Sequence, residues 1–413
     1  MIKNNPFTSD TFTNIWYKHF VKKQTLFLFN FINNINFYKL SIFPIYINVG
    51  RNLTKGISYS LNAQSSLKDF KKKVCLLYDV PAFFNIKAGN TQKGLKSLKI
   101  KQYPGFLIDL EKHKNFNNYF SATFSKSSIQ KFRRYKNRLE KCFNITHKMY
   151  IGNIDKQEYD SIFNSFKHLL TKRFDDKQIT NNNLNPKEWN FYYDVVYPLI
   201  LERKASLFVT YNDNTPIAIR LNYYSEDIIF DAITVFDIDY NKFHIGKISI
   251  IKILEWAFEN NYKIFDFSKG YFDYKEKWSD LKYDFEYHLY YDAKSIKAII
   301  LANSLAWFFR AKQYLRDMEM NKKLHEFTYL IRKKETQNRI ISEISESEID
   351  IKDNMLIALN LNNDLSYLKK NIFDFLFITN EHLNNLKIYQ VKHDHRKLIL
   401  LKNKKKSQLL LVS

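Results

Sequence analysis

The most regular pattern of apolar and polar positions lies between residues 125 and 295, where helix-like and strand-like stretches follow one another in a fixed order. Apolar residues at every third or fourth position predict helices, and short apolar or alternating runs bounded by polar residues predict strands. The predicted order is helix 125–141, strand 147–151, helices 155–174 and 186–203, strands 206–211, 216–223 and 227–235, helix 245–260, strand 264–267 and strand 285–291. This order predicts an α/β unit.

The flanking segments divide the rest of the chain. Strand-like runs at 41–47, 74–78 and 105–110 predict a separate α/β or α+β region before the regular unit, and 413 residues are too many for one compact core. After the unit, amphipathic helices are predicted first and then a hairpin formed by 386–391 and 397–401. The predicted parts are an N-terminal basic domain 1–145, a second domain 146–295, an amphipathic helical segment 296–345 and a small C-terminal appendage 346–413.

Charge is distributed unevenly between these parts. The chain carries a formal net charge of +23, and residues 1–150 contain 26 Lys and Arg against 6 Asp and Glu. A bias of codon usage would spread the excess along the whole chain, so the first domain is expected to face an anionic partner. Nucleotide phosphates, tRNA and an acidic membrane surface all have the required charge.

Cysteine content and hydropathy bear on the compartment. Cys75 and Cys142 are the only cysteines, and their separation fits neither a disulfide framework nor a zinc site. The first ten residues lack the apolar core of a signal peptide, and the apolar run 298–309 is too short to cross a bilayer. We expect a soluble cytoplasmic protein without a metal. The amphipathic segment after residue 295 allows peripheral contact with the inner face of the membrane as a second interpretation.

The stretch 263–278 carries the strongest candidate chemistry. A short apolar strand ends at Gly270, which permits a sharp turn, and Tyr274, Lys275 and Trp278 follow at helical spacing. Loops at strand ends are where α/β proteins place functional residues. The alternative interpretation is that Asp266 caps the turn, Trp278 fills the core and Lys275 is solvated.

Three local features make the chain resemble the GNAT superfamily of N-acyltransferases, in particular its CelD-type and Fem-type members. They are Lys172-Arg-Phe174 at the end of a long helix, Lys242-Phe-His-Ile-Gly-Lys247 at the start of a later one, and Phe265-Asp-Phe-Ser-Lys-Gly270 followed by Tyr274-Lys275. The resemblance covers about residues 120–295. It implies an α/β (α+β) fold of tandem GNAT-like domains, each with a mixed, mostly antiparallel sheet flanked by helices.

The resemblance also implies a donor site. GNAT enzymes bind the pyrophosphate of acyl-coenzyme A on backbone amides at a helix start, where unpaired N–H groups favour anions. The matching positions are Lys242, His244, Ile245, Gly246 and Lys247. This chain has one glycine where the usual pattern has two, and a glycine can also serve only close packing. Fem-type relatives, which take their acyl group from aminoacyl-tRNA, lack the full loop as well.

Catalytic roles follow from the same resemblance. In the Fem-type group the lysine of an aromatic-Lys pair lies at the transfer centre, which corresponds to Lys275, with Tyr274 shaping the acyl pocket. A cation there stabilises the oxyanion that forms when an amine attacks an ester or thioester. Asp231 is the candidate general base and His244 a second one, and either can be purely structural. The predicted substrate-binding residues are Lys131, Arg133, Arg134 and Gly270. The first three belong to the basic domain 1–145, which the resemblance implies is GNAT-like and which is expected to bind the acceptor.

These observations predict an N-acyltransferase that moves an acyl group, expected to be acetyl, from acyl-coenzyme A to an amine of a sugar or cell-envelope precursor. The expected acceptor is anionic, such as a nucleotide-linked or lipid-linked sugar, and no metal is required. Two alternatives remain open. One is a Fem-like aminoacyltransferase that uses aminoacyl-tRNA, and the other is a non-catalytic, anion-binding GNAT-like module.

Overall fold

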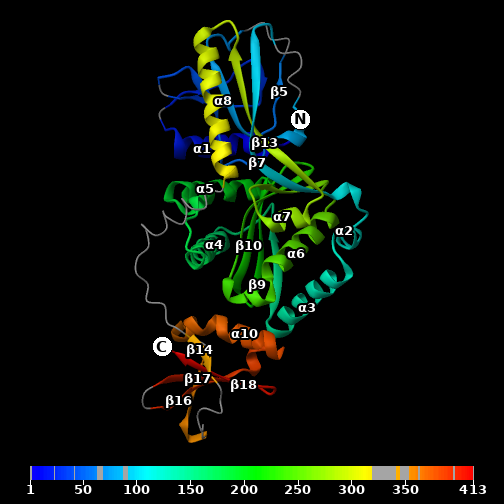
Figure 1. The fold of residues 1–413 in the computed structure, drawn as a ribbon, viewed down its shortest axis with the longest axis vertical. Helices are drawn as coiled ribbons and strands as arrows, with labels where there is room; N and C mark the ends of the chain where they lie inside the picture. Colours follow the sequence, from blue (N-terminus) through cyan, green and yellow to red (C-terminus); the bar gives the residue numbers. More distant parts are fainter. Residues whose placement is uncertain are drawn as a thin grey trace.

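The computed structural model describes residues 2–22, 24–40, 42–62, 68–86, 92–318, 341–344, 353–360, 363–393 and 396–412. One large mixed sheet runs through the upper and middle parts of the molecule, and a smaller sheet lies at its lower end (Figure 1). The order of the large sheet is β1-β3-β4-β6-β13-β7-β12-β11-β10-β9-β8. Its strands are β1 (Leu26–Phe27), β3 (Phe37–Lys39), β4 (Ile45–Asn48), β6 (Val74–Pro81), β7 (Leu95–Asp109), β8 (Ile145–Tyr150), β9 (Ala205–Asn212), β10 (Thr215–Tyr224), β11 (Ile228–Phe236), β12 (Ile264–Lys269) and β13 (Leu281–Asp292). A separate pair joins β2 (Ile32–Asn33) to β5 (Ser60–Leu61).

Two long strands tie the N-terminal half to the regular unit. β13 does not close the unit beside its own strands, because it inserts between β6 and β7 and pairs antiparallel with both. β7 lies between β13 and β12, so a strand from the first half connects the two parts of the sheet. The sequence predicts only the apolar end of β7, since its first half is interrupted by lysines. The predicted boundary near residue 145 therefore crosses a continuous sheet.

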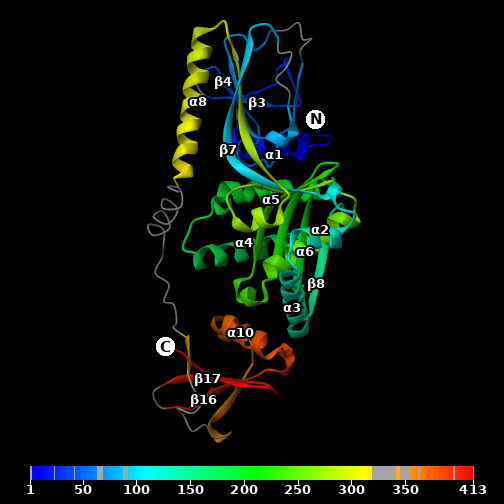
Figure 2. The ribbon, with the colours of Figure 1, turned by 45° about the vertical axis from the view of Figure 1, so that its right-hand side comes forward.

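Helices cover both faces of the sheet (Figure 2). Side chains of α4 and α5 pack on one face of β9, β10 and β11. Side chains of α2, α3 and α6 pack on the opposite face of these strands and of β12. α8 lies on β6, β7 and β13. The helices are α1 (Asp10–Phe20), α2 (Phe116–Thr123), α3 (Lys126–Cys142), α4 (Lys156–Asp176), α5 (Pro186–Leu201), α6 (Ile245–Glu259), α7 (Asp273–Trp278) and α8 (Ile296–Asp317).

Local chemistry explains where two of these helices begin. The hydroxyl of Ser125 accepts a hydrogen bond from the backbone N–H of Ser128 at 3.3 Å, which caps α3 as its sequence predicts. α5 begins with Pro186, whose missing N–H costs nothing in the first turn. The predicted α/β class, with a mixed, mostly antiparallel sheet flanked by helices, is confirmed.

The C-terminal appendage is a small module that shares a core with the regular unit. Its sheet has the order β14-β18-β17-β16-β15, and α10 packs against α3 and against the segment Ile238–Phe243 that precedes α6. Phe373 and Leu376 of α10 belong to the same buried cluster as Phe243 and Ile245. The predicted hairpin is confirmed as β16 and β17. The elements are β14 (Ile341–Ile344), β15 (Leu356–Leu359), α10 (Lys369–Thr379), β16 (Lys387–Val391), β17 (Lys397–Lys402) and β18 (Ser407–Val412).

The predicted helical segment 296–345 is observed as α8 over its first part, but residues 341–344 form the strand β14 and not a helix. Residues 319–340 and 345 lie outside the described residues. Among the helices that the structure describes, none is both long enough and apolar enough to span a bilayer.

Candidate active site

The candidate site forms where the parallel strands β11 and β12 separate. They pair only from Ile228 to Phe230 on β11 and from Ile264 to Asp266 on β12, although both strands continue. Past this point β12 pairs on its other side with β7, where Lys269 lies opposite Gly105. The separation leaves a gap between the two strands, and side chains from β10, β11 and α7 approach each other there.

The end of β12 has an unusual backbone. Ser268 has a left-handed φ of +59° and Gly270 a φ of +127°. A non-glycine residue in the left-handed region costs free energy, and such residues often lie at functional sites. The carboxylate of Asp266 holds the turn, because its Oδ1 accepts a hydrogen bond from the Ser268 N–H at 2.8 Å. The predicted role of Asp266 in shaping the turn therefore matches the geometry.

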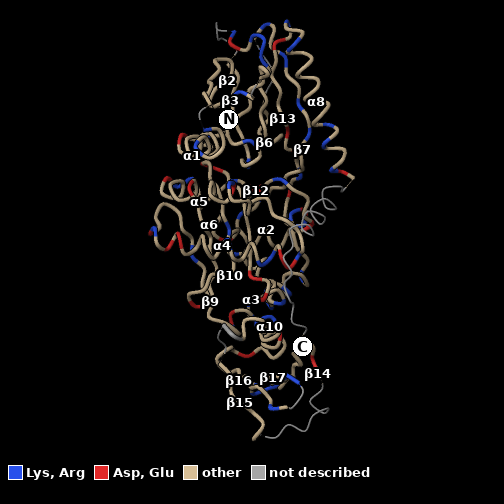
Figure 3. Tube along the Cα trace, turned by 90° about the vertical axis from the view of Figure 1, so that its left-hand side faces the viewer, with Lys and Arg blue, Asp and Glu red and all other residues tan. Residues whose placement is uncertain are grey.

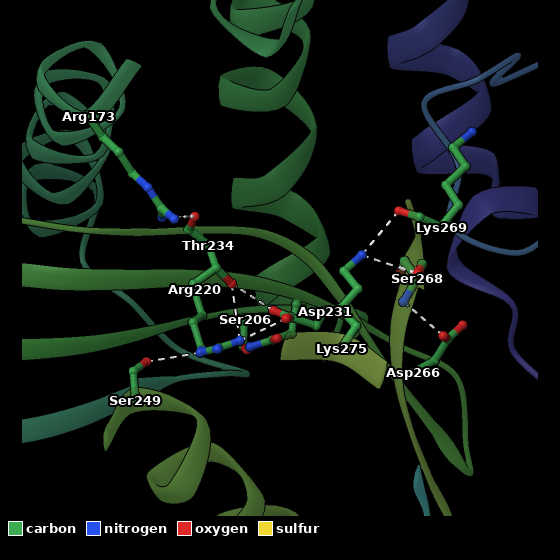
Figure 4. A network of polar contacts seen from close by, with 11 residues as sticks. Arg173, Ser206, Arg220, Asp231, Thr234, Ser249, Asp266, Ser268, Lys269 and Lys275 are labelled. Carbon is green, nitrogen blue, oxygen red and sulfur yellow. Dashed lines mark hydrogen bonds and ion pairs between the residues drawn. The ribbon is translucent and has the colours of Figure 1, made fainter. Parts of the chain in front are cut away.

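Lys275 points its amine at this turn. Its Nζ donates to the carbonyl oxygens of Ser268 at 3.2 Å and Lys269 at 3.1 Å, and the residue is only 6% exposed (Figure 4). Burial lowers the pKa of the Lys275 ammonium to about 8, while Asp231 and Asp266 act in the opposite direction. An ammonium has three donors, and two of them are used here. The third makes no hydrogen bond among the described residues, and the Phe272 ring centroid lies 5.2 Å from the Lys275 amine.

Asp266 itself is fully buried. Its Oδ2 accepts a hydrogen bond from the Tyr283 hydroxyl at 2.7 Å, and burial raises the pKa of the carboxyl to about 7. Gly105 makes this contact possible, because a Cβ at that position would lie 2.2 Å from the Tyr283 ring. A carboxyl that titrates near neutral pH thus lies behind the Lys275 turn.

A buried ion pair forms the other side of the site. Nη1 of Arg220 lies 2.8 Å from Oδ2 of Asp231, and its Nε donates to the Ser249 hydroxyl at 2.9 Å (Figure 4). Thr234 donates to Oδ1 of Asp231 at 2.9 Å. Both oxygens of Asp231 are therefore occupied, so its role as general base remains a prediction. Tyr274 precedes Lys275 on α7, is partly exposed, and packs its ring beside that of Phe267.

The N-terminal half also contributes charged groups, Asp79 and Lys55. Nζ of Lys269 pairs with Asp79 of β6 at 2.6 Å, and the Thr54 hydroxyl binds the other oxygen of Asp79 at 2.9 Å. Lys55 is near the same groups. Burial, followed by the charge of Lys269, lowers the pKa of the Lys55 ammonium to about 8. Two lysines with lowered pKa values, Lys55 and Lys275, therefore face one site from two halves of the chain.

The predicted donor loop lies apart from these groups, at the start of α6. His244 has a left-handed φ of +54°, its ring centroid lies 4.0 Å from that of Tyr135, and burial lowers its pKa. Ile245 is buried, and a Cβ on Gly246 would lie 2.7 Å from the Phe236 ring. The glycine is therefore needed for packing, whatever else it does.

The two lysines of this loop have different surroundings. Lys242 forms an ion pair of 3.1 Å with Asp374 of α10, and Lys247 is exposed with its amine over the Phe132 ring. Phe243 packs against Phe377 of α10. The C-terminal module thus covers one side of the predicted donor loop.

The predicted substrate contacts Lys131, Arg133 and Arg134 are exposed on α3. The packed side of this helix contacts the predicted donor loop through Tyr135, beside His244, and Phe132, beneath the amine of Lys247. Arg133 and Arg134 line an open groove of about 470 Å³, which is completed by Gln130, Asn137, Arg138, Lys141 and Asn380. Gly270, by contrast, lies at the Lys275 turn.

Sequence reasoning did not identify Arg220 and Lys55 as site residues. Arg220 is the one charged residue in an otherwise uncharged strand, and this position could have marked it as a buried ion-pair partner. Lys55 stands in a lysine-rich region without a distinctive pattern. Within the described residues no group of His, Cys, Asp and Glu side chains could hold a metal ion.

Comparison with known proteins matches one part of the chain to a protein family. The model of the acetyltransferase (GNAT) domain matches residues 126–276, which include α3, the donor loop and Lys275. No curated protein matches the sequence significantly. The match leaves residues 1–125 and 277–413 outside it.

Several solved structures are similar at low identity. A conserved protein of unknown function from Bacteroides thetaiotaomicron shares 9% identity at a TM-score of 0.46, covering 70% of this chain and 91% of that one. The C-terminal domain of a putative lysylphosphatidylglycerol synthetase from Agrobacterium fabrum shares 10% at 0.42, covering 73% and 95%. FemX shares 10% at 0.42, covering 62% and 83%. The family match is the stronger finding: the chain contains an acetyltransferase domain of the GNAT superfamily, residues 126–276, and is an acyltransferase by virtue of that domain.

Proposed function

We propose that the chain is an N-acyltransferase that moves an acyl group, expected to be acetyl, from acyl-coenzyme A to an amine of a sugar or cell-envelope precursor. The observation that carries the proposal is the Lys275 amine, buried at the point where β11 and β12 separate and held by two carbonyl oxygens. Such a donor is preorganised for a negative charge that develops during reaction.

The chemistry needs few groups. The neutral acceptor amine attacks the thioester carbonyl carbon, and a C–N bond forms. The carbonyl oxygen becomes an oxyanion, which accepts a hydrogen bond from the third N–H of Lys275. The C–S bond then breaks, the thiolate leaves and takes up a proton, and the acceptor nitrogen loses one. Asp231 is the predicted base for this nitrogen, and Tyr274 the predicted wall of the acyl pocket.

The donor is proposed to bind near the start of α6. Backbone N–H groups at a helix start favour phosphate, and Lys247 adds an exposed cation there. α3 contacts the same loop through Tyr135, and the exposed cations of this helix favour a donor with several phosphate groups. Coenzyme A meets this description.

Calorimetry with acetyl-coenzyme A tests the donor. We expect the wild type to bind it and Gly246→Asp to lose binding, because the substitution adds negative charge and pushes a side chain into Phe236. Gly246→Ala is the matched control, since it adds the Cβ without the charge. Loss of binding in both variants would point to packing alone, and wild-type protein that ignores acetyl-coenzyme A would contradict this donor.

A second candidate is an aminoacyltransferase that uses aminoacyl-tRNA. The observation that favours it is the cover over the loop: Asp374 of α10 pairs with Lys242 and places a carboxylate where a pyrophosphate would bind. Binding of charged tRNA by a protein that ignores acetyl-coenzyme A would make this the better proposal.

A further inference from the structure

The helix α8 has apolar side chains on two faces, and the described residues of the chain cover only one of them. The inner face carries Ala298, Ala302 and Ala306, which are buried and small enough to let the helix lie close to the sheet. Phe309 completes this face, with its ring stacked on Tyr287 at a centroid distance of 4.0 Å. These contacts account for the position of α8 on β6, β7 and β13.

The outer face carries a second set of apolar side chains, with the exposed polar residues Asn303 and Ser304 between Ile300 and Trp307. Six side chains on it are more than half exposed, with Ile296 at 75% and Trp307 at 73%. Their spacing places them along one side of a helix that is about 33 Å long at 1.5 Å per residue. We call this set the α8 stripe, and it consists of Ile296, Ile300, Trp307, Phe308, Tyr314 and Met318.

An apolar stripe of this length on a protein surface marks a contact with something else. In Figures 1 and 2 α8 lies along the outer edge of the upper part of the molecule, so the stripe is accessible along its length. Trp and Tyr within it are the residues that favour the boundary between water and lipid.

The charges beside the stripe indicate what covers it. Lys297, Arg310 and Lys312 are exposed on the same helix, and its one acidic residue, Asp317, is engaged by Tyr271 and Gln313. Figure 3 shows blue Lys and Arg stretches along α8. A second copy of the chain would place these cations against their own kind, whereas an anionic bilayer offers both negative headgroups and apolar chains.

We propose that the α8 stripe binds the surface of an anionic lipid bilayer, with the helix lying in the plane of the interface. The apolar side chains enter the boundary between headgroups and acyl chains, and the flanking cations contact the headgroups. This inference goes beyond the proposed acyl transfer, since it holds for any acceptor.

Vesicle co-sedimentation of the full chain tests the inference. The wild type should bind vesicles of phosphatidylglycerol and phosphatidylcholine in equal parts on the order of tenfold more tightly than vesicles of phosphatidylcholine alone, and added salt should reduce this preference. Ile300→Ser combined with Trp307→Ser should weaken binding to the anionic vesicles by on the order of tenfold or more. Lys297→Gln with Arg310→Gln and Lys312→Gln should remove most of the anionic preference.

The matched control is Leu201→Ser with Ile378→Ser, which removes two exposed apolar side chains from α5 and α10 and should leave binding unchanged. Thermal unfolding establishes that each variant is folded. Absent binding to anionic vesicles, or binding that the stripe variant leaves intact, overturns the proposal. A wild-type dimer that the stripe variant dissociates, without vesicle binding, would make the stripe an interface between copies and would also overturn it.

Discussion

Two lysines of the acetyltransferase domain show how the same residue type acquires different chemistry. Lys275 is 6% exposed, donates to two backbone carbonyls and has a pKa lowered to about 8. The side chain of Lys242 is 47% exposed and pairs with Asp374 at the surface. Burial gives Lys275 a preorganised charge that water does not screen, whereas Lys242 retains its hydration. The position in the fold, more than the motif, therefore separates the proposed oxyanion donor from a surface ion pair.

The ion pairs beside these lysines differ in the same way. Arg220 and Asp231 are both nearly inaccessible to solvent, while Lys242 and Asp374 are not. Removing one partner of a buried pair leaves an uncompensated charge, and removing one partner of an exposed pair leaves a hydrated one. The contrast can be measured on stability and on turnover.

The largest expected effect is on stability. Arg220→Met leaves Asp231 buried without its partner, so we expect a loss of about 3–5 kcal/mol in the free energy of unfolding. Lys242→Met, the matched change at the exposed pair, should cost less than about 1 kcal/mol. Urea unfolding measures both. Equal losses in the two variants would show that the burial contrast has no energetic meaning.

The second-largest expected effect is on turnover, which should differ between variants of Lys275 and Lys242. Lys275→Met keeps the apolar stem and deletes the charge, so kcat should fall on the order of 10²- to 10³-fold with donor affinity retained. Lys242→Met should keep kcat. If Lys275→Met stays within about threefold of the wild type, corresponding to less than about 1 kcal/mol of barrier, Lys275 is structural and the non-catalytic module becomes the better interpretation.

The buried carboxyl behind Lys275 predicts a pH effect on stability. The pKa of Asp266 is raised from 3.8 to about 7 in the folded chain, so between these pH values the folded state binds a proton that the unfolded state has lost. The contribution of this group to stability is present below pH 4 and is lost as pH rises through 7. Asp266→Asn should therefore gain stability relative to the wild type from pH 5 to pH 8, by on the order of 2 kcal/mol. A difference that does not vary with pH would contradict the raised pKa.

The smallest effect concerns the cations of α3. Replacing Lys131, Arg133 and Arg134 with Glu should raise the KM of the phosphate-bearing donor several-fold and flatten its salt dependence, because α3 borders the donor loop. The sequence assigns these residues to the acceptor, and a rise in the acceptor KM alone would support that assignment. Unchanged KM values for both substrates would mean that the groove serves neither.

The sequence predicts the elements of this fold better than their partners. The strands and helices from β8 to β12 follow from periodicity and turn residues, and Ser125 and Pro186 mark helix starts correctly. The pairing of β13 with β6 and β7 does not follow, because an apolar strand carries no record of its neighbours. The first half of β7 cannot be predicted from the sequence either, because its lysines break the apolar pattern of a strand.

The candidate site divides in the same manner. The Gly270 turn and Lys275 are local in sequence, so the motif indicates them together. The lowered pKa of Lys275 and the raised pKa of Asp266 depend on burial by residues far along the chain, which no local pattern encodes. The cover of α10 over the donor loop is likewise a contact between distant segments.

The central claim is that the charged amine of Lys275 stabilises the oxyanion, and the pH dependence of kcat tests it most directly. Side-by-side profiles of the wild type and Lys275→Met should show a wild-type kcat that falls above about pH 8, as the ammonium loses its proton, and a low kcat in the variant without this descending limb. A variant that retains both the wild-type rate and the same descending limb would contradict the claim.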